Sequence, residues 1–390
     1  CLVGGPARND GFRAAAGSEA TIMEEKNTAR IPDGFDPNGP GIANGSYFGL
    51  PFAPEESSLV LIPVPWDVTV SYREGTALGP GAILDASLQV DLYDVHCPGA
   101  WKRGIGTAEL DDTWPLRSRM LREEARRVIE HWETGGSPDS ESLRRRLRRV
   151  NEGAERLEAE VYAEACRWLD AGKTVGVVGG EHSVPLGLIR AVAERHPGLG
   201  ILHVDAHADL REAYEGFVRS HASIMFNALC EAPSLASLVQ VGVRDFCDEE
   251  ARLAADDPRV TMFDGPGLSA SKFAGESWHS LCERIVARLP QQVYVSFDID
   301  GLTPQYCPHT GTPVPGGLTF DEAVYLLSRV AASGRRIVGF DLCEVAPAPS
   351  GDDEWDANVG ECCTSSVCSR CRRSDGRLMV GRCGRPDAER

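Results

Sequence analysis

The sequence lacks a long apolar run and lacks an excess of basic residues. None of its apolar stretches approaches the roughly 20 residues that a helix needs to cross a bilayer. Acidic residues outnumber basic ones by 58 to 40, which gives a formal net charge of −18. Proteins that bind nucleic acids carry the opposite charge, because phosphate backbones attract Lys and Arg. We therefore expect neither a membrane partner nor a nucleic-acid partner.

The sequence also lacks the features of a secreted, disulfide-stapled protein. Its first twenty residues contain no apolar core of a secretion signal, and Met23 is the first plausible start. The 13 cysteines are odd in number and scattered singly, apart from five in the last thirty residues. In a long acidic chain this pattern indicates reduced thiols rather than a disulfide framework. We predict a cytoplasmic protein.

Composition divides the 390 residues into three segments. Residues 1–45 are rich in Gly, Pro, Asn and Ala without a period, and we predict a partly disordered N-terminal extension. Residues 46–360 carry regular patterns and form one predicted domain. Residues 361–390 are Cys-rich and show no helical period, so we predict an atypical, disordered tail. Its CxxC pair, Cys368 and Cys371, has no second pair of ligands, which disfavours a zinc knuckle.

Short β-rich runs alternate with helix-like stretches through the middle segment. The predicted strands lie at 58–66, 174–180, 199–205, 237–245, 292–300 and 336–345. Helical spacing of apolar residues marks 184–196, 277–289, 320–334 and the charged segment from about 117 to 172. The Arg-rich patch at 143–150 fits a solvated helix face better than a polyanion site. Alternating β and α units predict a three-layer α/β/α fold with a mostly parallel sheet.

Acids and histidines follow four of these predicted strands. In a parallel sheet the carboxyl ends of the strands meet at one edge, where ligands bind. The side chains expected at this edge are Glu181, His182 and Ser183, then Asp205, His207 and Asp209, then Asp298 and Asp300, and finally Asp341 and Glu344.

The spacing of these residues predicts a metal site. Side chains at alternate positions of an extended segment point to the same side, so Asp205, His207 and Asp209 converge, as do Asp298 and Asp300. Clustered carboxylates become protonated unless a cation neutralises them. With His182, two imidazoles and four carboxylates are too many for one tetrahedral zinc and suit two ions of the Mn²⁺ type. The alternative, that the acids only cap loops or helices, fits one of these groups but not all three.

The motifs, in this order, resemble the ureohydrolase family of arginases, agmatinases and guanidinobutyrases. The matching stretches are GGEHS (179–183), DAHADLR (205–211), SHAS (220–223), SFDIDGLTP (296–304), GTPVPGG (311–317) and GFDLCEVAP (339–347). An upstream loop at 64–83 extends the likeness. The resemblance implies an arginase-like fold and a ureohydrolase catalytic domain over residues 46–360.

The resemblance also implies a role for each matching residue. His182, Asp205, Asp209 and Asp298 would hold one divalent ion, and His207, Asp205, Asp298 and Asp300 the other. Mn²⁺ is expected, with Ni²⁺ as the alternative. Asp209 would orient the nucleophile, Glu344 would pair with the guanidinium group, and His221 would pass a proton to the leaving amine.

The sequence departs from the family pattern at two further positions. The family commonly has Asp where Glu181 and Thr303 stand, and both positions lie outside the six ligands. We predict structural roles for His203, within a strand, and for His309, in a loop near the site. Arg211 is expected to lie outside the metal ligands.

The loop at 211–223 resembles the agmatinase side of the family rather than arginase. We predict release of urea from agmatine or a similar small guanidino compound, with free guanidine as the alternative substrate. Asp67 or Glu74 would hold the amine of agmatine, whereas Trp66, Thr69 or Tyr72 would close a smaller pocket. A non-catalytic ureohydrolase-fold binding protein is a further alternative, although all six ligands are present. The resemblance implies a homo-oligomer, a trimer or hexamer.

Overall fold

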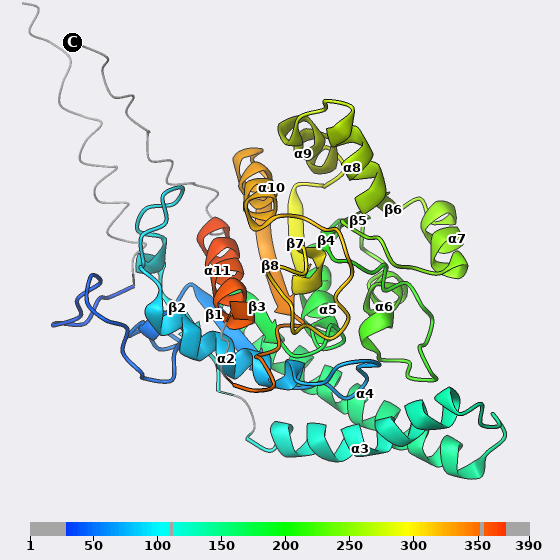
Figure 1. The fold of residues 1–390 in the computed structure, drawn as a ribbon. Helices are drawn as coiled ribbons and strands as arrows, with labels where there is room; N and C mark the ends of the chain where they lie inside the picture. Colours follow the sequence, from blue (N-terminus) through cyan, green and yellow to red (C-terminus); the bar gives the residue numbers. More distant parts are fainter. Residues whose placement is uncertain (1–28, 110–111, 352–354, 372–390) are drawn as a thin grey trace, which may run out of the picture.

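Eight strands form one parallel sheet across the middle of the molecule (Figure 1). The computed structural model describes residues 29–109, 112–351 and 355–371. Within these residues the strand order is β2-β1-β3-β8-β7-β4-β5-β6, and every neighbouring pair is parallel. The strands are β1 (Leu59–Val64), β2 (Ile105–Thr107), β3 (Thr174–Gly179), β4 (Gly200–Val204), β5 (Ser237–Val241), β6 (Val260–Phe263), β7 (Gln292–Asp298) and β8 (Arg336–Cys343).

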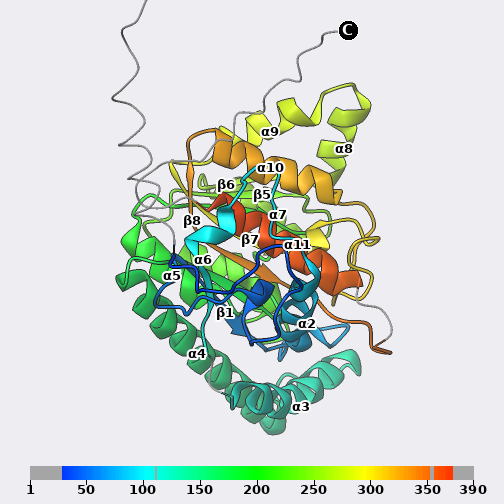
Figure 2. The ribbon, with the colours of Figure 1, turned by 90° about the vertical axis from the view of Figure 1, so that its left-hand side faces the viewer.

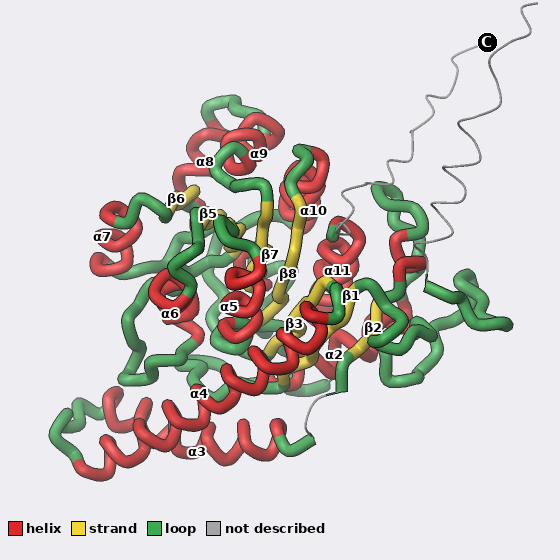
Figure 3. Tube along the Cα trace, turned by 180° about the vertical axis from the view of Figure 1, so that it is seen from behind, coloured by secondary structure: helices red, strands yellow, loops and turns green. Residues whose placement is uncertain are grey.

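Helices cover both faces of the sheet and give the molecule three layers. Figure 1 shows α10 and α11 over one face, and Figure 3, from the opposite side, shows α4, α5 and α6 over the other. Two buried hydrophobic clusters hold the layers together. The helices are α2 (Gly79–Ala86), α3 (Trp114–Glu133), α4 (Glu141–Asp170), α5 (Leu186–Arg195), α6 (Ile224–Glu231), α7 (Asp248–Asp256), α8 (Gly265–Phe273), α9 (Trp278–Val286), α10 (Phe320–Ala332) and α11 (Trp355–Arg370). The arrangement confirms the predicted fold class.

The inner strands form where apolar residues run without interruption. Every residue of β4 is buried, and so is every residue of β7 after Gln292. Because helices cover both faces, such strands favour continuous apolar runs over alternation. Some helices begin at residues whose side chains accept hydrogen bonds from otherwise free N–H groups, as Ser140 does for α4 and Thr319 for α10.

The six strands predicted from the sequence are the six inner ones, and the two edge strands were missed. β2 has three residues and β6 has four, most of them only half-buried in β6. A segment so short carries neither a long apolar run nor an alternation that separates it from a loop.

The charged segment predicted as helical forms α3 and α4, which lie side by side (Figure 2). The Arg-rich stretch belongs to α4, where Arg146 and Arg149 both pair with Glu124 of α3. These ion pairs fit a charged helix surface rather than a polyanion site. No helix in the described ranges is both long enough and apolar enough to cross a membrane.

The Cys-rich tail begins differently from its prediction. We expected a disordered segment from residue 361, but residues 361–370 form the second half of α11. Most of this helix is buried, including Cys363, Val367 and Cys368. A helix that is buried on most of its surface shows no amphipathic period, because small side chains on several faces contact the core. The absence of a period was therefore the wrong signal for disorder here.

The remaining predictions about the ends of the chain stay predictions. Residues 1–28 and 372–390 lie outside the described residues, and with them most of the expected extension and tail. Residues 29–45 contain no helix or strand. The boundaries of the predicted domain, 46 and 360, are not tested by these observations.

Candidate metal centre

Four neighbouring strands end at one edge of the sheet and bring the predicted metal ligands to it. β3 leads into His182, β4 leads into Asp205, and Asp298 is the last residue of β7. Glu344 follows β8, which lies between β3 and β7. The carboxyl edge of a parallel sheet is where ligands bind in open α/β folds.

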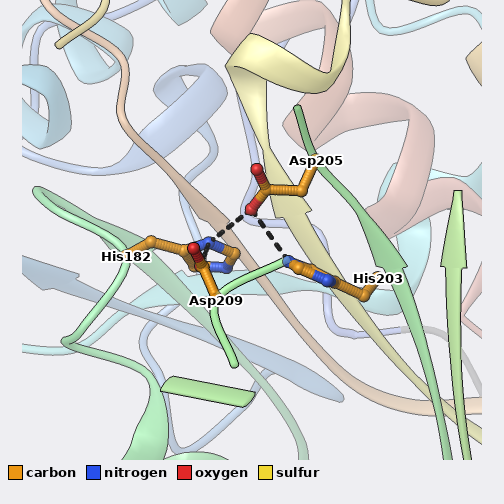
Figure 4. Close-up of side chains that lie close together, drawn as sticks. All are labelled: His182, His203, Asp205 and Asp209. Carbon is orange, nitrogen blue, oxygen red and sulfur yellow. Dashed lines mark hydrogen bonds and ion pairs between the residues drawn. The ribbon is translucent and has the colours of Figure 1, made fainter. Parts of the chain in front are cut away.

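His182 lies against three carboxylates. Its Nδ1 atom is 3.0 Å from Oδ2 of Asp205, 3.1 Å from Oδ2 of Asp209 and 3.4 Å from Oδ2 of Asp298. Figure 4 shows the first two of these contacts. His182 and the three acids, Asp205, Asp209 and Asp298, are all buried. A single small volume therefore contains one imidazole and three acids that are shielded from water.

His207 lies against a second, overlapping group of acids. Its Nδ1 atom is 3.1 Å from Oδ2 of Asp300 and 3.4 Å from Oδ1 of Asp205. The backbone N–H of Asp300 donates to Oδ1 of Asp298 over 2.8 Å. Asp205 thus presents one oxygen to each histidine, and the structure brings all six predicted ligands into one cluster.

The electrostatics of the cluster call for a cation. Burial, and then the charges of Asp300 and Asp205, raise the pKa of Asp298 well above its usual range. Burial also raises the pKa of Asp209 to about 6, and Asp205 adds to this effect. Burial acts to lower the pKa of His182, but its hydrogen bonds to the acids hold that pKa well above the usual value. A metal ion would replace this proton and neutralise the acids.

The atoms also lie close enough to hold an ion. Among the described residues, three groups have ligand atoms within 4.8 Å of one another: His182, His203, Asp205 and Asp209; Asp205, His207 and Asp300; and His182, Asp341 and Cys343. The donors of the first two groups are imidazole nitrogens and carboxylate oxygens, which bind divalent ions such as Mn²⁺ and Zn²⁺. The cluster is therefore able to hold a divalent metal ion.

Asp209 and Glu344 adopt a backbone conformation that side chains usually avoid. Their φ angles are 54° and 64°, in the left-handed region. Neighbouring hydrogen bonds hold both: the Asp209 carbonyl accepts from Met225 N–H and Phe226 N–H, and the Glu344 carbonyl accepts from Thr310 Oγ. Strain of this kind persists where the surroundings enforce it, and it is concentrated at functional sites.

Glu344 reaches the cluster through the turn that follows β3. Its Oε1 atom accepts a hydrogen bond from His182 N–H over 2.8 Å, and its own N–H donates to the carbonyl of Gly180. A Cβ atom at Gly180 would lie 2.0 Å from the carbonyl oxygen of Trp66, so only glycine fits there. Burial, and then the charge of Glu181, raise the pKa of Glu344 well above its usual range.

Thr69 connects Glu181 with His221. Its hydroxyl donates to Oε1 of Glu181 over 3.0 Å and lies 3.4 Å from Nδ1 of His221. The backbone N–H of His221 also donates to this hydroxyl, over 3.2 Å. The hydroxyl hydrogen of Thr69 is donated to Glu181, so this hydroxyl can only accept a hydrogen bond from Nδ1–H of His221. The ring proton of neutral His221 is therefore assigned to Nδ1, and Nε2 is the nitrogen that can take up a proton. Burial, helped by the charge of His207, lowers the pKa of His221 to about 3.

Trp66 does not join the cluster. Its ring packs against Trp114 with centroids 5.9 Å apart and borders a cavity of about 500 Å³ beside α3 and α4. Thr69 is fully buried and is engaged with Glu181 and His221. Trp66 and Thr69 were predicted to line a substrate pocket. Their positions indicate instead that they support the site without contacting a substrate directly.

The two acids considered for a substrate amine are already engaged. Glu74 forms ion pairs with Arg122 and Arg126 of α3. The oxygens of Asp67 accept hydrogen bonds from Gly75 N–H and, at 3.4 Å, from Ser118 Oγ. Two arginines therefore neutralise Glu74, whereas Asp67 is held by two uncharged donors.

The three residues predicted to lie outside the ligand set have the following contacts. His309 Nδ1 lies 2.8 Å from Oδ1 of Asp356, which ties its loop to α11. Arg211 lies 3.6 Å from Glu250 and stacks on Tyr214. His203 is fully buried, as expected, but its Nε2 atom lies 2.8 Å from Oδ2 of Asp205.

The sequence interpretation placed Asp341 at this edge without assigning it a partner, and it missed Ser296 and Gln240. Ser296 and Asp341 contact His182, while Gln240 contacts His203. One signal was present: His203 and Ser296 each stand two residues before a predicted ligand, in strands that are otherwise apolar.

The fold and the site together define an α/β/α protein with a buried His/Asp cluster able to hold metal. The sequence profile of the arginase family matches residues 57–361. The chain belongs to the arginase family, as its motifs predicted, and the relatives support a ureohydrolase enzyme.

Its relatives include N(1)-aminopropylagmatine ureohydrolase of Thermus thermophilus, with 33% identity over 294 residues, 75% of this chain and 84% of the relative. Agmatinase of Bacillus anthracis is 31% identical over 301 residues, 77% of this chain and 87% of the relative. The structure of agmatine ureohydrolase from Thermoplasma volcanium has the same fold, with a TM-score of 0.60 and 23% identity over 82% of this chain and 92% of that one.

Proposed function

We propose that this chain is a binuclear-metal hydrolase that cleaves a guanidino C–N bond and releases urea. The observation that carries this proposal is the convergence of two imidazoles and four carboxylates, with Asp205 in contact with both His182 and His207. The names of the relatives, agmatinase and aminopropylagmatine ureohydrolase, support agmatine or a similar small guanidino compound as the substrate.

Six side chains would hold the two ions, with two of the carboxylates shared between them: His182, Asp205, Asp209 and Asp298 for the first ion, and His207, Asp205, Asp298 and Asp300 for the second. A set of four carboxylates and two imidazoles suits Mn²⁺, with Ni²⁺ as the alternative. When bound, two divalent ions would lower the pKa of the attacking water.

Three residues of the chain would carry out the remaining steps. Glu344 would bind the guanidinium group. Burial and the charge of Glu181 disfavour the ionised form of Glu344, and the positive charge of the guanidinium would stabilise that form. Asp209 would accept a hydrogen bond from the attacking water and orient it. His221, neutral at pH 7, would take up at Nε2 the proton that the attacking water loses as its oxygen bonds to the guanidinium carbon. It would then transfer this proton to the leaving amine as the C–N bond breaks.

Free guanidine is a second candidate substrate, and one observation favours it. Agmatine carries an ammonium group at its far end, but Glu74 is paired with two arginines and Asp67 is hydrogen-bonded. Guanidine has no such group, so Glu344 would be the one carboxylate needed to bind its charge. Urea and ammonia would be the products.

A urea-release assay across agmatine, guanidine, arginine and 4-guanidinobutyrate tests these proposals. The protein is stripped with a chelator and reloaded with Mn²⁺ or Ni²⁺ before each assay. Release of urea from one of the four compounds is expected. If all four fail with a chain that holds both ions, the enzyme proposal is wrong and the non-catalytic binding protein is favoured.

Two further proposals concern the setting of the enzyme. We place it in the cytoplasm, and we expect a homo-oligomer, a trimer or a hexamer, whose only other partner is the small guanidino substrate. Size-exclusion chromatography with light scattering of the full chain measures the assembly directly.

A further inference from the structure

Four neighbouring strands each carry one buried polar residue at the same level of the sheet. The register pairs Asp341 of β8 with Ser296 of β7, Ser296 with His203 of β4, and His203 with Gln240 of β5. All of these side chains are fully buried. We call them the polar row: Asp341, Ser296, His203 and Gln240.

The polar row lies directly beneath the metal-ligand level. His203 stands two residues before Asp205, and Ser296 two residues before Asp298. Residues two apart in a strand face the same side, so the row shares the face of the ligands. Its neighbours across the sheet are apolar at both ends, Val177 on β3 and Met262 on β6. Buried polar groups cost stability unless they are hydrogen-bonded, so their bonds indicate what they do.

One arm of the row orients Asp205. The side-chain nitrogen of Gln240 lies 2.6 Å from the carbonyl of Ala208 and 3.0 Å from Nδ1 of His203. A carbonyl only accepts, so the Gln240 nitrogen donates to both atoms, and Nδ1 of His203 is an acceptor. The ring proton of His203 is therefore on Nε2, which donates to Oδ2 of Asp205 over 2.8 Å (Figure 4).

The other arm orients His182. The hydroxyl of Ser296 donates to Oδ1 of Asp341 over 3.1 Å, so it accepts from Nε2 of His182, 2.9 Å away. Asp341 Oδ1 itself lies 3.5 Å from the same Nε2. A proton held on Nε2 leaves the lone pair of Nδ1 for a metal ion, and Nδ1 is the atom that faces the three acids.

We propose that the polar row is a set of positioning residues that fixes His182 and Asp205 for metal binding. Gln240 and His203 select the rotamer of Asp205. Ser296 and Asp341 select the ring tautomer of His182. The inference rests on the proposed metal site but not on the identity of the substrate. Groups that orient metal ligands in this way typically change metal affinity about 10- to 100-fold when they are removed.

The test compares Mn²⁺ binding by variants of the two arms with matched controls. Ser296→Ala and Gln240→Met each remove one hydrogen-bonding group and nearly keep the volume. The controls are Ser57→Ala, at a buried serine that bonds the carbonyl of Ala53, and Gln292→Met, at the first residue of β7. Chelator-stripped protein is titrated with Mn²⁺ by calorimetry, and circular dichroism verifies the fold.

We expect both arm variants to lose Mn²⁺ affinity by about 10- to 100-fold and both controls to bind like the wild type. The electron paramagnetic resonance spectrum of the Mn²⁺-loaded arm variants should also change, which a merely structural role would not produce. Wild-type affinity and an unchanged spectrum in folded Ser296→Ala protein would overturn the proposal. If neither arm variant folds, calorimetry on Ser296→Thr, which keeps the hydroxyl, is expected to show wild-type affinity, and weakened binding there would overturn it.

The same titration separates this inference from the proposed enzyme activity. A wild-type chain that binds two Mn²⁺ ions but releases no urea contradicts the activity alone, and the comparison of variants still decides the polar row. A wild-type chain that binds no Mn²⁺ would overturn the positioning role as well.

Discussion

The hydroxyl of Thr69 lies 3.4 Å from Nδ1 of His221, between that ring and the buried carboxylate of Glu181. The two residues are 152 positions apart in the sequence, and their contact was not foreseen. Thr69 was expected to close a substrate pocket, whereas its position gives it a second candidate role in setting the tautomer of the proposed proton carrier.

Replacing Thr69 should therefore affect turnover more than substrate binding. We expect Thr69→Val to lower kcat about 10-fold with little change in KM or in Mn²⁺ affinity, because His221 loses the acceptor for Nδ1–H. For comparison, His221→Gln removes the acid–base group itself and should cost about 10²- to 10⁴-fold in kcat. Steady-state kinetics on the substrate found by the urea assay measure both.

Thr69→Ser is the matched control, since it keeps the hydroxyl and should stay close to the wild type. If Thr69→Val raises KM and leaves kcat unchanged, Thr69 acts as a wall of the pocket, as first predicted.

Removing one acid of the cluster should stabilise the metal-free protein. Folding raises the pKa of Asp298 above its value in the unfolded chain. The carboxyl group therefore stabilises the fold at low pH, and this contribution is lost as the pH rises through the pKa of the folded state. At pH 7 without metal, Asp298→Asn should have a Tm equal to or above the wild type. The variant should also lose the rise in Tm that Mn²⁺ gives the wild type, because a shared ligand is missing.

Differential scanning fluorimetry with EDTA and with Mn²⁺ measures both effects. Asp256→Asn, at an exposed position of α7, is the control and should respond to Mn²⁺ like the wild type. A metal-free Asp298→Asn protein that melts well below the wild type would show that the carboxylate stabilises the empty site.

The ion pairs of Glu74 predict how the enzyme treats agmatine. Because Arg122 and Arg126 already neutralise this carboxylate, Glu74→Gln should leave the KM for agmatine within about twofold of the wild type. A loss of stability of up to about 1 kcal/mol is expected for these partly exposed pairs. A KM for agmatine that rises tenfold, with no change for guanidine, would identify Glu74 as the amine-binding acid after all.

Glu361 on α11, which is not one of the candidate metal ligands, should make stability depend on pH. This buried side chain has one oxygen without a hydrogen-bond partner in the described residues, and burial raises its pKa to about 7. A raised pKa in the folded state means that its stabilising contribution is present below about pH 4.5 and is lost as pH rises through 7.

Glu361→Gln removes this loss, because glutamine stays neutral. Since one pKa unit corresponds to about 1.4 kcal/mol, the variant should gain roughly 2 to 3 kcal/mol over the wild type between pH 5 and pH 8.5. Urea unfolding at the two pH values measures the gain, with Glu249→Gln at an exposed position of α7 as the comparison. A difference between variant and wild type that is the same at both pH values would contradict the prediction.

The candidate ligands could be predicted from the sequence because they directly follow apolar strand-forming runs, as Asp205, His207 and Asp209 do. The extended spacing assumed for them is not what the structure shows: β4 ends at Val204, and Asp209 has a φ angle of 54°. The partners of these ligands could not be predicted in the same way. Asp341 meets His182 only because β8 and β3 are neighbours in the sheet, and nothing in either segment states that order.

Two short strands and one mostly buried helical segment also escaped the sequence interpretation. β2 and β6 are too short for a pattern, while α11 is buried on most of its surface and has no polar face to mark it as a helix. Periodicity detects an element only when one side differs from the other.

By itself, the sequence determined the parallel α/β class, the carboxyl-edge position of the acids and the membership of the ureohydrolase family, since each depends on residues close together in the chain. Only the tertiary structure decided which strand lies beside which, and so which groups hold the ligands. It aligned Gln240, His203, Ser296 and Asp341 in one row and brought Thr69 to His221. Contacts between distant segments depend on strand order and register, which the packing of the whole chain selects.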